Sequence, residues 1–542
     1  MPRLSRRACL ALGGAALAAG PLGCAPSKDA PGYPATWVGA SAERGHRLRS
    51  PGPAGGWPAA AVQRRASVLV VGGGVAGLAA ARTLVQAGID DVHLLELEDH
   101  AGGNSRAHRM SGMACPLGAH YLPLPGPDAR EVAELLEALG LSRQQAGRTV
   151  YDERHLCHSP QERLFIDGAW VDGLLPPAPA GSPTLAQYRR FAQRLRELGA
   201  ELRFAMPTLG SGWQAGHDAL DRQTFEQWLQ AEGLDDARLR WYLDYCCRDD
   251  YGGGLAVVSA WAGLHYFASR HGFHVPGDGE VEREPVLTWP QGNAWLTERL
   301  AQALPDRLQA GRTVLRVSES RHEVRVLAWD EARQQAEDWT AGHVVMATPL
   351  FIAARLLAQA PSGLVEAVRQ QRHAPWLVSN LQLDEPLQGR RRDAPPSWDN
   401  VRHGGDPRAL GYVDAMHQSL RPHAGPTVLT VYWALPIAQR SALLQDSAAA
   451  WAARVVADLA VVHPDLPTKL RRADLMRWGH AMSVPVPGLR GSAALQALGR
   501  AAGRVRFAHA DLSAYSVFEE AYTWGVRVAG RLAGELRSRR VS

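Results

Sequence analysis

The chain has 542 residues, of which 46% are hydrophobic, so it is long enough and apolar enough to bury a large core in more than one domain. Its formal net charge is only +5, and no long basic block follows the N-terminal leader, so nucleic-acid binding is not expected. The six cysteines lack the spacings of metal ligands, and no metal site is expected. Adjacent Cys246 and Cys247 are predicted to be buried helix residues rather than a redox disulfide.

Residues 1–23 are predicted to be a twin-arginine export signal. Ser5–Leu10 resembles the twin-arginine motif through the pair Arg6-Arg7, and the apolar stretch Leu10–Leu22 that follows is too short and too glycine-rich for a membrane span. Leu22-Gly23-Cys24 also offers a lipoprotein cleavage site, with Cys24 as the lipidated residue. We therefore expect a periplasmic protein or one on the outer face of the cell envelope, either free or tethered through Cys24.

Residues 24–66 are rich in proline and glycine and are predicted to be a tether. After it, a dinucleotide-binding unit is predicted. The apolar run Ser67–Val71 leads into the glycine motif of residues 72–77, then into the helical stretch Leu78–Ala87, and a second apolar run, Val92–Leu95, ends at Glu96. Strand, loop, helix, strand and acid occur in the order that binds an adenine dinucleotide.

Each residue of this motif has a physical role in such a site. Gly72 permits the tight turn, Gly74 lets the backbone approach a pyrophosphate, and Gly77 lets the helix pack against the strand. Val75 and Ala76 begin the helix whose N-terminus faces the phosphate charge. The Glu96 carboxylate is expected to accept hydrogen bonds from the ribose hydroxyls.

The segment Glu96–Arg106 resembles the corresponding part of FAD enzymes in the flavin amine oxidase, phytoene desaturase and protoporphyrinogen oxidase superfamily. Those enzymes usually have Gly-Gly-Arg at its end, whereas this chain has Gly102-Gly103 followed by Asn104, with Arg106 two residues further on. The resemblance implies that the glycine pair approaches the pyrophosphate. Either Arg106 then neutralises the phosphate charge, or Asn104 forms a hydrogen bond to it.

The resemblance resumes later in the chain, in Trp289–Leu296, Arg312–Val317, Val344–Pro349, Val505–Asp511 and Phe518–Gly525. It implies that the backbone at Val314 contacts the adenine and that Asp511 stands where relatives have glutamate at the cofactor. It also implies that the final helix, which contains Trp524, points its N-terminus at the flavin, because a helix N-terminus stabilises an anion. The implied cofactor is FAD.

The implied fold class is α/β, with a Rossmann-like FAD-binding domain of the GR2 type and an inserted mixed α+β substrate domain. The FAD-binding domain is expected to combine residues 67–125, 285–360 and 495–542. The substrate domain is expected to combine helices from residues 126–284 with a sheet and a helix from residues 361–494. Helical apolar spacing covers Leu185–Leu202 and Leu239–Tyr245, and strand-like runs cover Leu377–Leu383 and Val428–Trp433.

The substrate site departs from that of amine-oxidising relatives, which commonly place a lysine in the sheet behind the flavin. The corresponding stretch, Leu377–Leu381, contains none. Val517 falls at one of the two aromatic positions of the amine cage, and Ala481 falls near the other. The cage is therefore expected to be absent or to be built from Tyr515, Phe518 or Tyr522. Trp478–Gly488 looks closer to the Trp-x-x-Ala-x-Pro segment of desaturases and porphyrinogen oxidases.

His480 is the titratable side chain that we expect near the flavin, where it acts as a base, orients the substrate, or is simply satisfied in the core. Asp249 and Asp250 are predicted to end a helix in a solvated turn, and the alternative is that they bind a cationic amine.

The function that we predict is an exported FAD-dependent oxidoreductase. It would move a hydride from an amine or a similar small substrate onto flavin N5, with oxygen, a quinone or a periplasmic carrier as electron acceptor. One alternative is a desaturase or isomerase of an apolar polyene or tetrapyrrole. Another is a flavin-binding partner protein without turnover.

Overall fold

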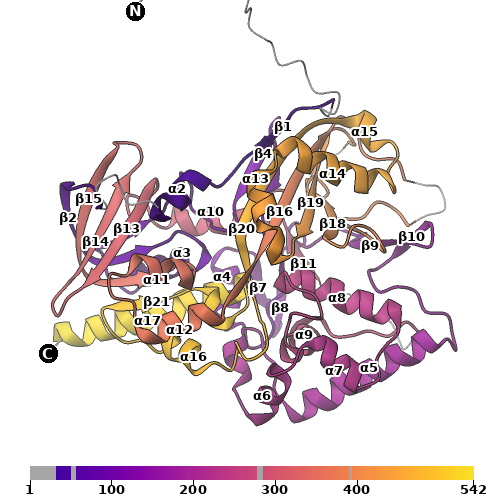
Figure 1. Cartoon of the computed structure of the whole chain (residues 1–542), viewed down its shortest axis with the longest axis horizontal. Helices are drawn as coiled ribbons and strands as arrows, with labels where there is room; N and C mark the ends of the chain where they lie inside the picture. Colours follow the sequence, from indigo (N-terminus) through magenta and orange to yellow (C-terminus); the bar gives the residue numbers. More distant parts are fainter. Residues whose placement is uncertain (1–31, 50–55, 278–284, 390–393, 422, 542) are drawn as a thin grey trace, which may run out of the picture.

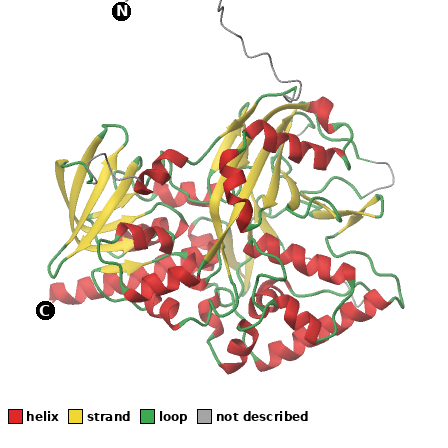
Figure 2. Cartoon of the chain, in the orientation of Figure 1, coloured by secondary structure: helices red, strands yellow, loops and turns green. Residues whose placement is uncertain are grey.

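Two large sheets form the framework of the protein, and they lie side by side with helices below and between them (Figures 1 and 2). The computed structural model describes residues 32–49, 56–277, 285–389, 394–421 and 423–541. The predicted export signal and Cys24 lie outside the described residues. None of the helices in the described parts of the chain combines the length and the apolar character that a membrane span requires.

The first sheet belongs to the predicted nucleotide-binding domain. In spatial order its strands are β12 (Leu308–Gln309), β3 (Val92–Leu95), β2 (Ala60–Val71), β15 (Gln335–Met346), β14 (Val324–Asp330) and β13 (Arg312–Glu319), with β21 (Val505–Phe507) also paired to β15. The pairs that join β12, β3, β2, β15 and β21 are parallel, and β14 and β13 extend the sheet in antiparallel fashion. The carboxyl ends of the parallel strands therefore meet at one edge, where open α/β sheets bind ligands.

The helices of this domain are α3 (Val75–Gln86), α4 (Arg130–Ala138), α10 (Ala294–Gln302), α11 (Leu350–Leu356), α12 (Ser362–Gln370), α16 (Ala493–Gly499) and α17 (Phe518–Val541). Helices α4 and α12 pack into the core of this domain, although their residues were expected in the substrate domain. Two glycines let α3 approach its neighbours. A Cβ on Gly77 would lie 1.9 Å from the Gly72 carbonyl oxygen, and a Cβ on Gly525 would lie 2.3 Å from the Ala76 carbonyl oxygen. The first contact sets α3 against the strand β2, and the second sets α17 against α3.

The second sheet forms the inserted domain. Its strands in spatial order are β1 (Ala35–Trp37), β20 (Leu470–Val484), β16 (Arg372–Leu383), β19 (Thr427–Ala434), β18 (Ala409–Asp414), β17 (Asp399–Arg402), β9 (Glu162–Ile166) and β10 (Ala169–Asp172). Apolar side chains on one face pack against α14 (Ala448–Ala460). Those on the other face pack against the helical layer of residues 183–271. Burial on both faces explains why β19 is a nearly continuous apolar run.

The remaining helices of this domain are α5 (Pro183–Glu201), α6 (Ala215–Asp221), α7 (Phe225–Ala231), α8 (Ala237–Tyr251) and α9 (Ala260–Tyr266) in the helical layer, and α13 (Arg440–Gln445) and α15 (Leu466–Lys469) near α14. Three short pairs of strands complete the described fold, namely β4 (Ala107–Met110) with β5 (Met113–Pro116), β6 (Tyr121–Pro123) with β11 (Val286–Thr288), and β7 (Ser142–Gln145) with β8 (Arg148–Tyr151). Cys246 and Cys247 are buried free thiols on α8, which confirms their predicted state.

The predicted tether of residues 24–66 is wrong for its described part. Strand β1 pairs in parallel with β20, and α2 (Ala42–His46) follows it as a capped helix. Strand β2 already begins at Ala60 and not at Ser67. Proline and glycine content misled the prediction, because a three-residue strand gains its hydrogen bonds from a distant partner that local composition does not reveal.

The expected order of helices first and a sheet later also needs correction. Strands β9 and β10 come from the block predicted to hold only helices, and they complete one edge of the second sheet. The 15-residue strand β20 has no counterpart among the predicted elements. Its sequence alternates poorly between apolar and polar residues, because both faces of the strand are covered over most of its length.

Candidate functional site

A single long cavity runs from the nucleotide-binding edge of the first sheet to the second sheet and the end of α8. Its volume is about 430 Å³, within the range typical of cofactor and small-molecule sites. It is lined by residues 71–76 at the β2–α3 turn, 95–97 after β3, 103–105, 118–121, 347–349 after β15, 478 and 480–482 on β20, and 516–519 at the start of α17. Segments that are hundreds of residues apart in the sequence therefore share one cavity.

The nucleotide end of the cavity is built from backbone. Gly72 has φ +105°, and a Cβ there would lie 2.6 Å from the Ala347 carbonyl oxygen. Gly74 and Gly103 face each other, since a Cβ on Gly103 would lie 3.0 Å from the Gly74 Cα. Side chains at these positions would fill the groove that the helix N-terminus of α3 faces. The surface therefore fits the pyrophosphate of a dinucleotide.

Glu96 lies at the end of β3, as the motif predicts. Its carboxylate accepts hydrogen bonds from the backbone N–H groups of Gly73 (2.6 Å) and Glu98 (2.8 Å). Burial raises the pKa of this carboxyl group, and the two backbone hydrogen bonds and Arg106 oppose that shift. The carboxylate lines the cavity and retains lone pairs for ribose hydroxyls.

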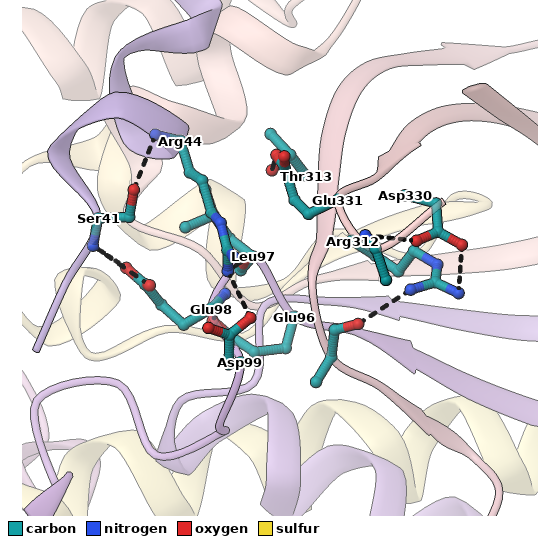
Figure 3. A network of polar contacts seen from close by, with 12 residues as sticks. Ser41, Arg44, Glu96, Leu97, Glu98, Asp99, Arg312, Thr313, Asp330 and Glu331 are labelled. Carbon is teal, nitrogen blue, oxygen red and sulfur yellow. Dashed lines mark hydrogen bonds and ion pairs between the residues drawn. The ribbon is translucent and has the colours of Figure 1, made fainter. Parts of the chain in front are cut away.

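A segment that the sequence analysis missed covers this end of the cavity. Gly45 and Leu48, in the α2 region, line the cavity, and α2 is held there by polar contacts (Figure 3). The Ser41 N–H donates to Glu98 (2.9 Å), and Arg44 donates to Asp99 (2.8 Å). The N-terminal arm therefore forms part of the cavity wall at the nucleotide end. The signal that reveals it is the capping serine before α2.

Figure 3 also shows the opposite wall of this end, where Arg312 pairs with Asp330 (2.9 Å). Arg312 and Val314 on β13 both line the cavity. The expected contact between the Val314 backbone and an adenine stays a prediction.

Asn104 and Arg106 take different positions. Asn104 lines the cavity, and its side-chain amide donates to the Ala481 carbonyl oxygen (2.6 Å). Arg106 is buried beneath the glycine pair, where its Nε donates to the Gly103 carbonyl oxygen (3.2 Å) and its guanidinium lies 5.4 Å from the Trp478 ring. Arg106 does not line the cavity, and neither does Gly102, so both support Gly103 from behind.

Asp511 lines the cavity but is already occupied by protein groups. His373 donates to its carboxylate (3.1 Å), and so does the backbone N–H of Leu350 (2.9 Å). Burial opposes ionisation of this carboxyl group, but His373 and His509 hold its pKa well below the usual range. Asp511, which follows β21, therefore links that strand to α11 and β16 beside the cavity.

Trp524 lies away from the main cavity. Its indole N–H donates to the Ser513 hydroxyl (2.8 Å), and its ring blocks a Cβ at Gly499. The expected cofactor contact of Trp524 is therefore corrected to a packing role in which α17 is set against α16. Phe518, Glu519 and Ala521, at the start of α17, line the cavity instead.

The far end of the cavity is lined by aromatic side chains. His120 stacks on Tyr432 with ring centroids 4.4 Å apart, and Tyr121 and Trp376 line the same region. Burial lowers the pKa of His120 to about 3, so its ring is neutral at physiological pH. Val378 on β16 faces the cavity from the sheet in which amine-oxidising relatives place a lysine.

These aromatic residues differ from those proposed from sequence. Among the candidates, Phe518 lines the cavity, whereas Tyr515 and Tyr522 do not. Tyr515 donates to Asp250, and Tyr522 stacks on Phe518 with ring centroids 5.8 Å apart. Four other residues were missed because strand pairing brings them together from distant parts of the chain, namely His120, Tyr121, Trp376 and Tyr432.

Asp249 and Asp250 are not in the solvated turn that the sequence favoured. Both lie in the last turn of α8 and line the cavity. Arg270 pairs with Asp250 (3.1 Å) and with Glu519 (2.8 Å), which also lines the cavity. The correction follows from packing, because α8 continues to Tyr251 and its end is covered by the second sheet and α17.

The Asp249 carboxylate differs from its neighbours, since it has no hydrogen-bond or ion-pair partner in the described part of the chain. Burial, with the charge of Asp250 added, raises its pKa to about 7. Asp250 and Glu519 share Arg270, whereas Asp249 forms no ion pair among the described residues. A cationic ligand would supply the missing partner.

His480 lines the cavity on β20. Its ring lies 4.6 Å from Phe351 and 6.2 Å from His373, measured between centroids. Burial and the nearby Arg440 lower its pKa to about 3. A neutral imidazole of such low basicity is suited to orienting a ligand and poorly suited to acting as a base at neutral pH.

Curated proteins of known activity align with parts of this chain. Putrescine oxidase of Kocuria rosea is 32% identical over 176 residues, which is 31% of this chain and 32% of that protein. Coproporphyrinogen III oxidase of Mycobacterium leprae (strain TN) is 29% identical over 316 residues, 56% of this chain and 64% of that protein. The chain thus aligns with less than two thirds of the length of these curated relatives.

Solved structures show the same fold. A putrescine oxidase bound to putrescine has a TM-score of 0.66 and 18% identity, and the match covers 87% of this chain and 100% of that one. Cyclohexylamine oxidase from Brevibacterium oxydans IH-35A has a TM-score of 0.64 and 16% identity over 87% of this chain and 99% of that one. The predicted α/β fold class is therefore confirmed. The model of the family of flavin-containing amine oxidoreductases matches residues 75–533, and this chain belongs to that family of FAD-dependent enzymes.

Proposed function

We propose that this enzyme binds FAD along the cavity and oxidises a cationic amine at the end lined by Asp249. The glycine cradle of Gly72, Gly74 and Gly103 would hold the pyrophosphate, and Glu96 would hold the ribose. Val314 and Arg312 would flank the adenosine. When bound, the flavin accepts the hydride that leaves the substrate carbon.

The observation that carries the choice of an amine is the unpartnered Asp249 carboxylate among aromatic rings. A carboxylate with a pKa of about 7 pairs with an ammonium group and is basic enough to share its proton. Three aromatic residues line the same cavity and would attract a cation there, namely Tyr121, Tyr432 and Trp376. Neutral His120 and His480 add no positive charge that would repel it.

The test is anaerobic mixing of the flavin-loaded enzyme with a panel of primary amines, diamines and secondary amines, observed through the absorbance of the oxidised flavin. Bleaching by an amine, without bleaching by the alcohol of the same carbon skeleton, is the expected result. The alcohols are the matched control because they keep shape and remove charge. The proposal would be ruled out if neither amines nor alcohols bleached the flavin, while dithionite still reduced it in the same protein.

The tetrapyrrole alternative is tested in the same apparatus. The relative named coproporphyrinogen III oxidase aligns with more of this chain than the putrescine oxidase does. A porphyrinogen bearing carboxylates would, however, place negative charge beside Asp249, Asp250 and Glu519, which favours the amine. Bleaching by a porphyrinogen and not by amines would reverse this choice. Reoxidation by air, a soluble quinone or a cytochrome then identifies the acceptor.

We also propose that the protein is exported by the twin-arginine route and acts in the periplasm or on the outer face of the envelope. The support is the Arg6-Arg7 pair before the apolar stretch Leu10–Leu22. Replacing both arginines by lysine should leave the enzyme in the cytoplasmic fraction, and labelling with a radioactive fatty acid would show whether Cys24 is lipidated. Periplasmic recovery of the double-lysine variant would contradict the proposed route.

A further inference from the structure

A second cleft lies between the helical layer of the inserted domain and the helices α16 and α17, outside the main cavity. Its volume is about 580 Å³. No acidic residue is among the described residues that line it. The proposed oxidation at Asp249 makes no use of this cleft. Its lining includes four arginines and two tryptophans, namely Arg490, Arg500, Arg527, Arg531, Trp213 and Trp524.

Arg490 is the most unusual of these residues. It is 8% exposed, and its Nε is buried without a hydrogen-bond partner in the described structure. Among the described contacts, its side chain forms one long hydrogen bond of 3.5 Å, from Nη2 to the Thr208 hydroxyl. Its guanidinium lies 5.4 Å from the Trp213 ring and 5.9 Å from the Trp261 ring. A buried guanidinium with so few acceptors is costly unless a ligand supplies them.

The acidic residues near Arg490 do not supply the missing hydrogen-bond acceptors. Glu520 and Asp221 are the carboxylates that act on its charge. Glu520 accepts from the Thr208 backbone N–H and from the Ser513 hydroxyl, and Asp221 accepts from the Gly491 N–H (3.1 Å). Neither forms a hydrogen bond or ion pair with Arg490 among the contacts of the described chain. Burial lowers the pKa of Arg490, against the attraction of these two acids.

The other three arginines lie at the rim and keep donors free. Arg527 pairs with Glu131 (2.7 Å), and Arg531 donates to the Gly499 carbonyl oxygen (2.7 Å). Arg500 is exposed, and no ion pair is seen for it within the described residues. Each guanidinium carries five N–H donors, so single contacts leave most of them available.

Trp213 forms an apolar wall of the cleft beside Arg490. Its indole N–H donates to the Asp218 carboxylate (2.7 Å), which satisfies the polar end of the side chain. Its ring stacks on His217 with centroids 5.5 Å apart, so the orientation of the indole is held by protein contacts. The wall is therefore in place before a ligand arrives.

We infer that this cleft binds a small oxyanion, either a phosphate or a carboxylate group of a metabolite, with Arg490 as its buried anchor. Guanidinium groups pair with both anions through two parallel N–H donors. The apolar part of such a molecule would pack on Trp213 and Trp524. Leu512 and Trp524 line this cleft while Asp511 and Phe518 line the main cavity, so neighbouring residues of the same segments face the two sites.

The test is isothermal titration calorimetry of the flavin-loaded, full-length enzyme with inorganic phosphate, citrate and benzoate in separate arms, at constant ionic strength. At least one anion should bind with saturation. Arg490→Met should then raise its Kd about tenfold or more, since a hydrogen bond to a charged group has about that value. Phosphate against citrate and benzoate distinguishes phosphate from carboxylate ligands.

Arg454→Ser is the matched control, because Arg454 lies on α14 far from the cleft and pairs with Asp446. The Kd of the Arg454→Ser variant for the anion should equal that of the unchanged enzyme. If Arg490→Met does not fold, the double variant Arg500→Ser with Arg531→Ser decides, because both residues are exposed at the rim. The inference would be overturned if the Arg490 and rim variants bound the anion with the Kd of the unchanged enzyme. It would also be overturned if none of the three anions showed saturable binding.

Discussion

The two ends of the main cavity are built in different ways. The nucleotide end is formed by backbone and glycines at the carboxyl edge of a parallel sheet, with one acid, Glu96, at a fixed distance along the chain. The far end is formed by side chains from β16, β19, α8 and α17, which come together only when the second sheet packs on the helical layer. In the proposed function, the first end binds the cofactor and the second end selects the substrate.

This difference explains how each end responds to change. A backbone cradle tolerates no added atoms, because it has no side chain that moves aside. In a pocket formed by side chains, a single residue can be substituted at moderate cost to stability. Each such substitution changes the chemistry of the pocket. Substitutions at the two ends should therefore have different effects on flavin binding and on catalysis.

Asp249→Asn should lower kcat/KM for the best amine about 100-fold while leaving flavin content unchanged. The variant keeps shape and removes the charge that pairs with the ammonium, an interaction worth about 2–5 kcal/mol when desolvated. Steady-state kinetics and the flavin-to-protein absorbance ratio are the measurements. Asp446→Asn is the control, because Asp446 pairs with Arg454 away from the cavity. Equal loss of flavin and activity would mean that the two ends are not separable.

Gly525→Ala should lower the free energy of unfolding by about 1–3 kcal/mol, because its Cβ would lie 2.3 Å from the Ala76 carbonyl oxygen at the first turn of α3. Gly534→Ala lies on the same helix with open space around it, and it should raise that free energy by up to about 1 kcal/mol. Denaturant titration of the flavin-loaded enzyme measures both. A stable Gly525→Ala variant would contradict the tight packing of α17 on α3.

The pH profile of kcat/KM should fall about tenfold per unit below pH 7. Protonation of Asp249, whose pKa is about 7, removes the carboxylate, so activity is lost as pH falls and is retained above that value. The charged groups that set this pKa are Asp250, which raises it, and Arg248 and Arg270, which lower it. Asp249→Asn should lack this limb. Its persistence in the variant would assign the titration to another group.

Glu96→Gln should weaken flavin binding about five- to tenfold, since an amide group places N–H donors against the N–H of Gly73 or Glu98 and removes the ribose acceptor. Fluorescence titration of the apoprotein with FAD measures the Kd. Glu366→Gln, on the exposed face of α12, serves as control. Amine specificity of the reloaded variant should not change, because Glu96 lies at the opposite end from Asp249.

The positions of the residues at the far end of the cavity could not be predicted from the sequence. Asp249 and Asp250 form a local pattern that is typical of a helix-ending turn, and nothing within α8 reveals that β20, β16 and α17 cover it. Likewise, Trp524 lies three residues after the cavity-lining Ala521 on the final helix, yet its side chain reaches Ser513 instead of the cavity. Long-range packing decided both.

The sequence alone determined the nucleotide end, because the turn at Gly72, the start of α3 and the acid at Glu96 depend on local backbone conformation and short spacings. Apolar periodicity also predicted several helices and strands, among them α5, α8, β16 and β19. Only the tertiary structure decided the capture of α2 over the cofactor groove, the charge environment of Asp249 and the arginine cleft at Arg490. These features depend on contacts between segments far apart in the chain, where burial and charge are set by partners that no local pattern contains.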